Sequence, residues 1–421
     1  MTQHHDFDSA SLAHELFDAL AAATGDGIGI TRECYAEGEN TALEIFTNAA
    51  KAAGLEIEAD QLANLVVRLP DDDGLSPALY IGSHADSVPR GGNFDGAAGI
   101  VAGLICLIRI LRSGRSLSVP VRVIMLRGEE SAFYGRANIG SRGLFGLIGE
   151  DDLLARSRGT GKMLQEAMAD LGIDVAGVLA RQVFFSPERA LGYLELHIEQ
   201  GPVMVAHDFP AAVVSGIRGN LRHRRVVCRG EAGHSGAIPR WLRHDPVFAF
   251  ADLVSRLDDH WQTLLERGTD LVVTCGIVGT DPADHAISRI PGVLAFSFEV
   301  RSQSQDTLDD FYVVFQDECQ KVAELRRVSF EFDPVVLAEP ARMAPEMIEA
   351  LESAARNLDI PFEVLPSGAG HDAAVFANAG IPSGMVFVRN RNGSHNPHEA
   401  MEIDDFLKGV DILHAAATAG N

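Results

Sequence analysis

The residues best suited to metal chemistry follow apolar segments that the sequence predicts as buried strands. Four such segments are followed by histidine or carboxylate side chains: His84 with Asp86, Glu129 with Glu130, His197, and His395. Asp95, in the glycine-rich stretch GGNFDGAAG, stands at the start of a predicted helix. In an open α/β sheet, ligands bind beyond the carboxyl ends of the strands. We therefore expect these side chains to converge on one crevice.

Imidazole nitrogen and carboxylate oxygen are ligands for Zn²⁺, Mn²⁺, Co²⁺ and Ni²⁺. Three histidines and two carboxylates are enough for two ions that share one bridging carboxylate. Two such ions polarise a carbonyl group and lower the pKa of a bound water to about 7. Glu129 and Glu130 are neighbours at a predicted strand end. Neighbouring side chains are expected to point in different directions there, so one could bind metal while the other accepts the water's proton.

Each motif alone has a simpler structural explanation. An isolated HxD is common, a Glu-Glu pair is usually a solvated face, and His395 lies in an Asn/Gly-rich loop typical of an exposed site. GHSG at His234 lacks the GxSxG elbow of a serine hydrolase. HExxH, a Walker loop and the zinc-deaminase pattern are also missing from the sequence. The prediction of a metal site therefore depends on the joint pattern.

The elements that must position these residues alternate between helix and strand in the N-terminal part. Apolar spacing predicts helices over 9–23, 41–53 and 97–111, and strands over 78–82, 119–126 and 192–197. After the middle of the chain, helices are predicted over 345–358, 374–379 and 403–417, with a strand over 384–388. This rhythm is typical of an α/β fold with a mainly parallel sheet.

The rhythm changes near Pro210. Strands are predicted over 211–217, 226–229, 271–278, 293–300 and 328–332, with long helices over 246–266 and 308–325. Two helices against a few antiparallel strands indicate a smaller α+β domain. We expect domains at 1–210 with 331–421, and at 211–330 as an insertion.

The overall composition excludes several classes of protein. The 421 residues carry a formal charge of −24, which does not fit a nucleic-acid or anionic-membrane binder. The longest apolar stretch is too short for a membrane span, and the polar start MTQHHDFDSA predicts no signal peptide. Five scattered cysteines form no CxxC pair, so neither a disulfide framework nor a thiolate zinc site is expected. These features predict a soluble, cytoplasmic protein.

Six motifs occur in the order GSHADSVPRGGNFDGAAGI, GEES, LELHIEQGPV, GEAGHSG, PSGAGHDA and SHNPHE. With these motifs the chain resembles the hydantoinase/carbamoylase family of two-metal amidohydrolases. This family includes N-carbamoyl-L-amino-acid hydrolases, allantoate amidohydrolases and β-ureidopropionases. The resemblance covers about residues 10 to 415. LELHIEQG and the eleven-residue step from His84 to Asp95 favour this branch over the related peptidases.

The resemblance implies a role for each matching residue of a metallohydrolase catalytic domain. His84 and His197 would bind one ion, Glu130 and His395 the other, and Asp95 both. Asp86 would orient His84, and Glu129 would be the general base.

The inserted domain would be a lid that also forms a homodimer. His234 would reach the partner's active site and stabilise the substrate's carbonyl oxygen. Arg301 would hold a substrate carboxylate, with further substrate contacts at Gln200, Ser288, Ser367 and His371.

Several positions depart from the family pattern without touching the expected metal ligands. Ser288 replaces an asparagine that helps hold the carboxylate, and Ala237, Ile238 and Arg240 replace the usual residues after the lid histidine. The expected substrate is an N-carbamoyl amino acid or a similar small carboxylate. An N-acyl amino acid or dipeptide hydrolase on the same scaffold is the alternative, and an inactive metal-binding protein is a third reading.

Overall fold

The computed structural model describes residues 8–419. The chain divides into two compact units: one runs to Ser215 and resumes at Arg342, and the other is Gly216–Ala341. The start of the chain, which predicts no signal peptide, lies mostly in residues 1–7, outside the described part. Within the described part, no helix has the length and apolar character needed to cross a membrane.

The larger unit is built on a sheet that has nine strands within residues 8–419, in the order β1-β2-β4-β3-β5-β17-β6-β15, with β16 paired to β6. The strands are β1 Glu56–Ala59, β2 Leu65–Arg68, β3 Ala78–His84, β4 Val121–Leu126, β5 Ala190–Ile198, β6 Ala211–Ile217, β15 Ala341–Arg342, β16 Phe362–Ser367 and β17 Ser383–Val388. The central pairs β4/β3, β3/β5 and β5/β17 are parallel. Antiparallel pairs flank them on both sides, at β2/β4 and β17/β6. The predicted α/β class with a mainly parallel core is confirmed.

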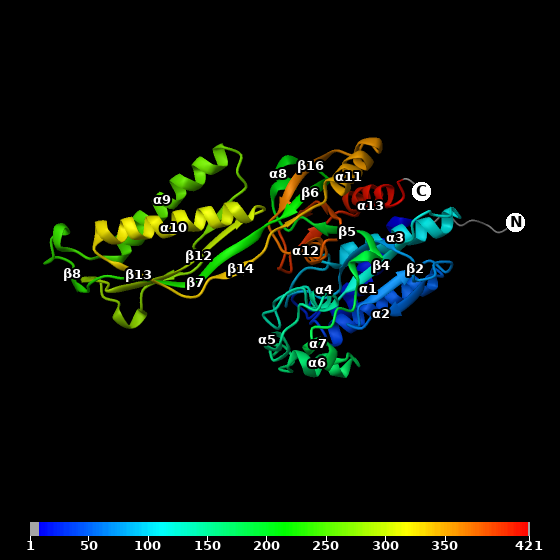
Figure 1. Cartoon of the computed structure of the whole chain (residues 1–421), viewed down its shortest axis with the longest axis horizontal. Helices are drawn as coiled ribbons and strands as arrows, with labels where there is room; N and C mark the ends of the chain where they lie inside the picture. Colours follow the sequence, from blue (N-terminus) through cyan, green and yellow to red (C-terminus); the bar gives the residue numbers. More distant parts are fainter. Residues whose placement is uncertain (1–7, 420–421) are drawn as a thin grey trace. The chain divides into compact units, whose positions relative to one another are not determined.

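Alternation along β5 assigns its two faces. Leu194, Leu196 and Ile198 belong to the main core, together with residues of α1 Ser9–Thr24, α2 Glu37–Ala52, α3 Ala97–Ser113, α11 Pro345–Asn357 and α13 Ile403–Ala417 (Figure 1). Tyr193 points the other way and stacks on Phe376 of α12 Asp372–Asn378, with ring centroids 4.0 Å apart. Because side chains alternate along a strand, His197 shares the α12 face.

Shorter helices connect these elements of the larger unit. They are α4 Ile139–Leu144, α5 Glu150–Leu153, α6 Leu164–Asp170, α7 Val175–Leu179, the 3₁₀ turn Pro187–Arg189 and α8 Val203–His207. The strands β18 Asn390–Arg391 and β19 Ala400–Met401 form a small antiparallel pair around the His395 loop.

The smaller unit has an antiparallel sheet in the order β10-β12-β7-β13, with β9 on β12 and β14 on β7. Its strands are β7 Gly219–Arg229, β9 Val272–Thr274, β10 Val278–Gly279, β12 Val293–Ser302, β13 Ser329–Phe332 and β14 Val336–Ala338. Two long helices, α9 Pro246–Glu266 and α10 Gln305–Arg326, lie side by side in green and yellow in Figure 1. Phe296, Phe298 and Val300 of β12 pack in the core with them.

The structure divides the chain at slightly different positions from those expected. The expected domain limits were 211 and 330, whereas the boundaries between the units fall along the chain at about 216 and 341. The first limit shifts because β6 pairs with β17 in the larger sheet, and the second because β14 pairs with β7. The strand expected over 271–278 is two short strands, β9 and β10, and β1 and β2 were not predicted.

Candidate metal centre and active site

Parallel pairing brings the first candidate residues to one edge of the larger sheet. His84 is the last residue of β3, His197 lies next to the end of β5, and Glu129 follows β4 by three residues. Asp95 precedes α3, and the next residue, Gly96, has a φ of 68°. A Cβ on Gly96 would lie 2.4 Å from the His84 ring, so only glycine lets the loop bring Asp95 this close.

One group of donors forms around Oδ1 of Asp95. This oxygen lies 3.5 Å from Nε2 of His84 and 3.2 Å from Nε2 of His197. The two imidazole nitrogens are themselves 3.4 Å apart. All three side chains are buried, and together they offer a potential metal-binding set.

A second group forms around the other oxygen of the same carboxylate. Oδ2 of Asp95 lies 3.4 Å from Nε2 of His395, which is 3.1 Å from Oε1 of Glu130. Half of the His395 side chain is exposed, at 51%, so this group is open to solvent. Asp95 therefore stands between two donor sets, one on each of its oxygens.

The hydrogen bonds behind the histidines leave lone pairs directed into the cluster. Nδ1 of His84 lies 3.1 Å from the carbonyl oxygen of Asp86, and Nδ1 of His197 lies 3.0 Å from that of Ile198. A carbonyl only accepts, so each Nδ1 carries the proton and each Nε2 presents a lone pair. Two lone pairs 3.4 Å apart repel each other unless a cation lies between them.

The buried carboxylates of the cluster would also be stabilised by a cation. Oδ1 of Asp95 and Oε1 of Glu130 are buried, and within residues 8–419 neither accepts a hydrogen bond of normal geometry. Burial raises the pKa of Glu129 well above its usual range; the charge of Glu130 adds to this and that of His84 opposes it. Buried carboxylates without counter-ions cost several kcal/mol each in proteins. The donor set therefore fits divalent metal ions.

Asp86 lies directly behind this cluster and is fully buried. Its Oδ1 is 3.3 Å from Nδ1 of His84 and accepts the backbone N–H of Glu129 at 3.0 Å. Its Oδ2 accepts the N–H of Glu130 at 3.0 Å. One carboxylate thus fixes both the first histidine and the turn that carries the two glutamates.

Gln200 also belongs to the cluster. Its φ is 63°, and its side-chain Nε2 donates to Oδ2 of Asp95 at 2.8 Å. Its Oε1 is buried and, within the described chain, accepts no hydrogen bond. The amide oxygen of Gln200, next to the potential metal ligands, can therefore accept a hydrogen bond from a bound molecule.

Ser367 and His371 are brought together but lie deeper than expected for substrate contacts. Oγ of Ser367 donates to Ala369 O at 2.9 Å, so Nε2 of His371 is the donor in its own 2.9 Å bond to that hydroxyl. Burial holds the pKa of His371 well below its usual value. The His371 ring is 4.4 Å from that of His197, and with Glu195 these two histidines form a third group of potential donors.

Two buried residues that the sequence analysis did not single out hold Asp95 in place. Oε1 of Glu399 accepts the backbone N–H groups of Phe94 and Asp95 at 2.9 and 3.2 Å. Arg32 is fully buried and donates to the carbonyl oxygens of Ala85 and Asp95. Glu399 was within reach of sequence reasoning because it ends the SHNPHE motif, whereas Arg32 stands in no spacing pattern.

His234 and Ser288 lie together in the smaller unit, although 54 residues separate them. The short strands β8 Gly233–His234 and β11 Arg289–Ile290 pair, and the N–H of Ser235 donates to Ser288 O at 2.8 Å. Nδ1 of the exposed His234 accepts the N–H of Gly236 at 3.2 Å. The ring proton is therefore on Nε2, which can act as a donor.

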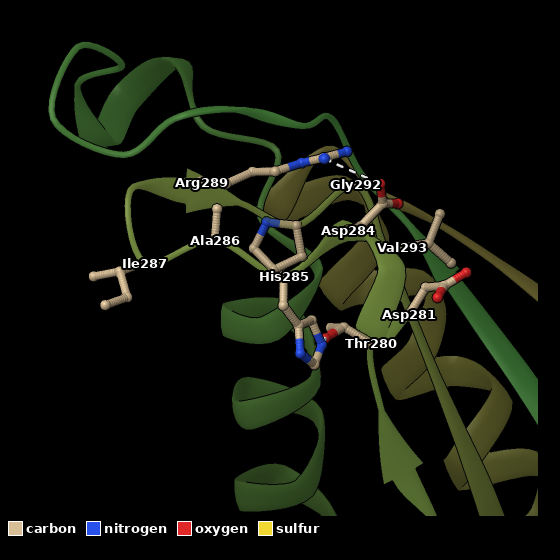
Figure 2. Close-up of a pocket in the computed structure, with 10 residues that line it drawn as sticks. Thr280, Asp281, Asp284, His285, Ala286, Ile287, Arg289, Gly292 and Val293 are labelled. Atoms are coloured by element: carbon tan, nitrogen blue, oxygen red, sulfur yellow. Dashed lines mark hydrogen bonds and ion pairs between the residues drawn. The ribbon is translucent and has the colours of Figure 1, made fainter.

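A pocket of about 380 Å³ lies in this loop region, lined by residues between Thr280 and Val293 (Figure 2). Arg289 forms an ion pair with Asp284 at 3.0 Å across it. Ile287, beside Ser288, is fully exposed at the turn. The pocket thus belongs to the same loop region as His234, since Arg289, one of its lining residues, pairs with His234.

Arg301 lies elsewhere in the smaller unit, on the sheet face opposite the helices. It is partly exposed, and its guanidinium lies 3.1 Å from Oε1 of Glu299. Arg222 on the neighbouring strand lies 3.2 Å from the same oxygen. Oε1 of Glu299 is thus within ion-pair distance of two arginines on this face.

Comparison with known proteins connects this arrangement to a family. The model of Peptidase family M20/M25/M40 matches residues 80–419. An N-carbamoyl-L-amino-acid amidohydrolase of Paenarthrobacter aurescens is 31% identical over 395 residues, which cover 94% of each chain. The allantoate amidohydrolase of Escherichia coli is 29% identical over 91% of each chain.

A solved structure agrees with these relatives. The hydantoinase/carbamoylase family amidase from Burkholderia ambifaria has a TM-score of 0.84 and 27% identity, covering 98% of this chain and 96% of its own. The resemblance seen in the six sequence motifs is thereby confirmed. The chain belongs to the M20/M25/M40 peptidase family, in the branch of the hydantoinase/carbamoylase amidohydrolases.

Proposed function

We propose that this protein is a two-metal amidohydrolase that cleaves the linear C–N bond of an N-carbamoyl amino acid or a similar carboxylate-bearing ureido compound. The observation that carries the proposal is the position of Asp95 between two histidine–carboxylate groups, with Glu129 beside them. The names of the relatives support the substrate class.

The two donor groups define which residues would hold the ions. His84 and His197 would bind one ion, Glu130 and His395 the other, and Asp95 both, with Asp86 orienting His84. Zn²⁺, Mn²⁺, Co²⁺ and Ni²⁺ all suit nitrogen and carboxylate donors. When bound, such ions supply Lewis-acid polarisation of the scissile carbonyl and make a water molecule more acidic.

Glu129 would move the proton. Its Oε2 lies 4.0 Å from Nε2 of His84 and so faces the cluster. The carboxylate takes a proton from the attacking water as the new C–O bond forms at the carbonyl carbon. It then gives that proton to the leaving nitrogen as the C–N bond breaks. With an N-carbamoyl amino acid, this step releases the amino acid and carbamic acid, and the carbamic acid then breaks down to CO₂ and ammonia.

The substrate's carboxylate would bind to Arg301, because a planar guanidinium matches a carboxylate in a bidentate manner. Gln200 offers its amide oxygen, and Ser367 with His371 would support the substrate side of the metal cluster. Ser288 is shorter than the family's asparagine and would contribute less to the carboxylate.

Arg301→Lys is expected to lower kcat/KM for the acid substrate by about tenfold or more. A charge-assisted hydrogen bond contributes about 1.5–3 kcal/mol, and each factor of ten corresponds to about 1.4 kcal/mol. The loss should largely vanish with the matching substrate amide, which has no carboxylate. Arg222→Lys, at the other arginine beside Glu299, is the matched control and should change the acid-to-amide ratio little. Equal damage to both substrates in Arg301→Lys would show that the carboxylate assignment is wrong.

His234 would complete the active site of a partner subunit in a homodimer formed through the inserted domain. Its Nε2–H is free to donate to the carbonyl oxygen, because Nδ1 already accepts from Gly236. We expect that mixing inactive Glu129→Gln subunits with inactive His234→Ala subunits restores activity, since a heterodimer would hold one intact site. Mass spectrometry should confirm subunit exchange; exchange without recovery would argue against a shared site.

A second candidate function is hydrolysis of an N-acyl amino acid or dipeptide. The departures from the family pattern at Ala237, Ile238 and Arg240 support this second candidate, because these residues follow shortly after His234, the proposed contact to the substrate's carbonyl oxygen. Ile238 and Arg240 line a cavity of about 780 Å³ that also includes the exposed Trp241. Different side chains lining this cavity would change which substrate group can bind next to the scissile bond.

Matched N-carbamoyl and N-acyl amino acids, assayed together with metal analysis, test the proposal. Preference for the carbamoyl compounds supports it, and preference for the acyl compounds or dipeptides selects the second candidate. A protein that binds two ions but hydrolyses none of the panel would be the inactive metal-binding protein instead.

A further inference from the structure

Asn138 connects the proposed general base to a second buried carboxylate. Its side-chain Nδ2 lies 3.3 Å from Oε1 of Glu129 and 3.0 Å from Oδ1 of Asp372. Both partners are carboxylates, so the amide nitrogen must be the atom that faces them. An NH₂ group has two hydrogens, and each carboxylate can therefore accept one of them.

The backbone fixes Asn138 at this place. Its φ is 54°, in the left-handed region that asparagine tolerates better than most residues. Its N–H donates to Glu129 O at 2.9 Å, and the N–H of Ile139 donates to Gly128 O at 2.7 Å. The segment that carries the amide is thus bonded directly to the turn that carries Glu129.

Asp372, the second carboxylate that contacts Asn138, is also held in place by its neighbours. It is the first residue of α12 and is fully buried. The hydroxyl of Ser141, in α4, donates to its Oδ1 at 2.5 Å. Ser141 and Asn138 therefore hold the same oxygen of Asp372, and Asp372 in turn fixes the orientation of the asparagine amide.

This chain of contacts decides which oxygen of Glu129 is available for chemistry. Oε1 is occupied by the Asn138 amide, whereas Oε2 faces the metal-capable cluster, 4.0 Å from Nε2 of His84. Without the amide, Glu129 and Asp372 would be two neighbouring buried carboxylates with no donor between them. Repulsion would then turn the base out of its position.

We propose that Asn138, supported by Asp372 and Ser141, is a positioning residue that holds Glu129 with Oε2 directed at the attacking water. This inference rests on the proposed function, since it assumes that Glu129 moves the proton. It assigns no metal contact to Asn138.

Asn138→Gly tests the proposal, because glycine adopts a positive φ without strain and removes only the side chain. We expect kcat to fall by about 10–100-fold, the usual effect of a misplaced catalytic group, with KM and metal content nearly unchanged. Asn138→Asp keeps the size and the backbone preference but replaces the donor by a charge, so it should lose at least as much activity. The midpoint of thermal unfolding is measured in both variants to exclude a general loss of structure.

The decisive control is the Glu129→Gln background. If Asn138 acts through Glu129, adding Asn138→Gly to Glu129→Gln should change the residual rate by less than about twofold, because the two effects are not additive. An equal loss in both backgrounds would overturn the proposal, as would an unchanged kcat in Asn138→Gly while wild type is active.

Crystal structures of the metal-loaded protein separate this inference from the proposed function. In wild type, Oε1 of Glu129 should accept a hydrogen bond from Asn138, and in Asn138→Gly the carboxylate should turn or lose order. This result can be read even if no substrate of the panel is hydrolysed, in which case only the proposed function fails. A Glu129 carboxylate in the same place in both structures would overturn the positioning role.

Discussion

Glu129→Gln is expected to lower kcat by about 10²–10⁴-fold while both metal ions stay bound, which is the usual contribution of a positioned general base. Glutamine keeps the size of the side chain and can still contact Asn138, but its amide cannot take a proton from water. The two donor groups around Asp95 do not include Glu129, so metal content and KM should change little. Steady-state kinetics and metal analysis on the same preparation measure both effects.

Glu130→Gln is the matched control, because it is the same substitution one residue away. Glu130 belongs to the group with Asp95 and His395, so its loss should reduce metal occupancy as well as the rate. His395→Ala should behave in the same way. If Glu129→Gln loses metal and Glu130→Gln keeps it, the two glutamates have exchanged their proposed roles.

The position of the cluster could be predicted from the sequence because parallel strands impose it. The segments before His84, Glu129 and His197 are apolar enough to be buried, and β3, β4 and β5 pair as parallel neighbours. Their carboxyl ends must then meet at one edge, whatever the sequence distance between them. The same rule brings the segment after β17 to this edge, because β17 is parallel to β5, although His395 follows β17 by seven residues in a loop.

The supports of the cluster could not be predicted in this way. Asp372 lies 234 residues from Asn138, and their contact depends on how α12 packs against α4. Arg32 donates to the carbonyl oxygen of Asp95 from 63 residues away. Such contacts follow from tertiary packing. From residue type alone, an asparagine in a turn or an isolated arginine is more typical of a surface position.

The domain limits show the same difference between local and long-range information. The segment 211–217 has the composition of a strand in either sheet, and only its pairing with β17 assigns it to the larger one. In the smaller unit, β8 and β11 are two residues each and too short for a periodic signal. Yet this short pair brings His234 beside Ser288, where the departures from the family pattern gather.

Removal of metal is expected to abolish turnover and leave the fold nearly intact. The donors lie at the edge of the sheet, whereas the main core is formed by aliphatic and aromatic side chains of β3, β5 and helices such as α3 and α13. A domain with such a core does not depend on metal for folding, unlike a zinc finger. After treatment with a chelator, activity should be lost while the far-UV circular dichroism stays nearly unchanged. Addition of Mn²⁺, Co²⁺, Ni²⁺ or Zn²⁺ should restore turnover.

A chelator already saturated with metal is the control, since it should not inactivate the protein. The midpoint of thermal unfolding should fall on metal removal, because ions that bind only the folded state stabilise it by mass action. Without them, Asp95, Glu129 and Glu130 are left as buried carboxylates around histidine lone pairs. Full activity in protein shown to be free of metal would contradict the two-metal proposal, and a collapse of the circular dichroism would show that the ions also maintain the fold.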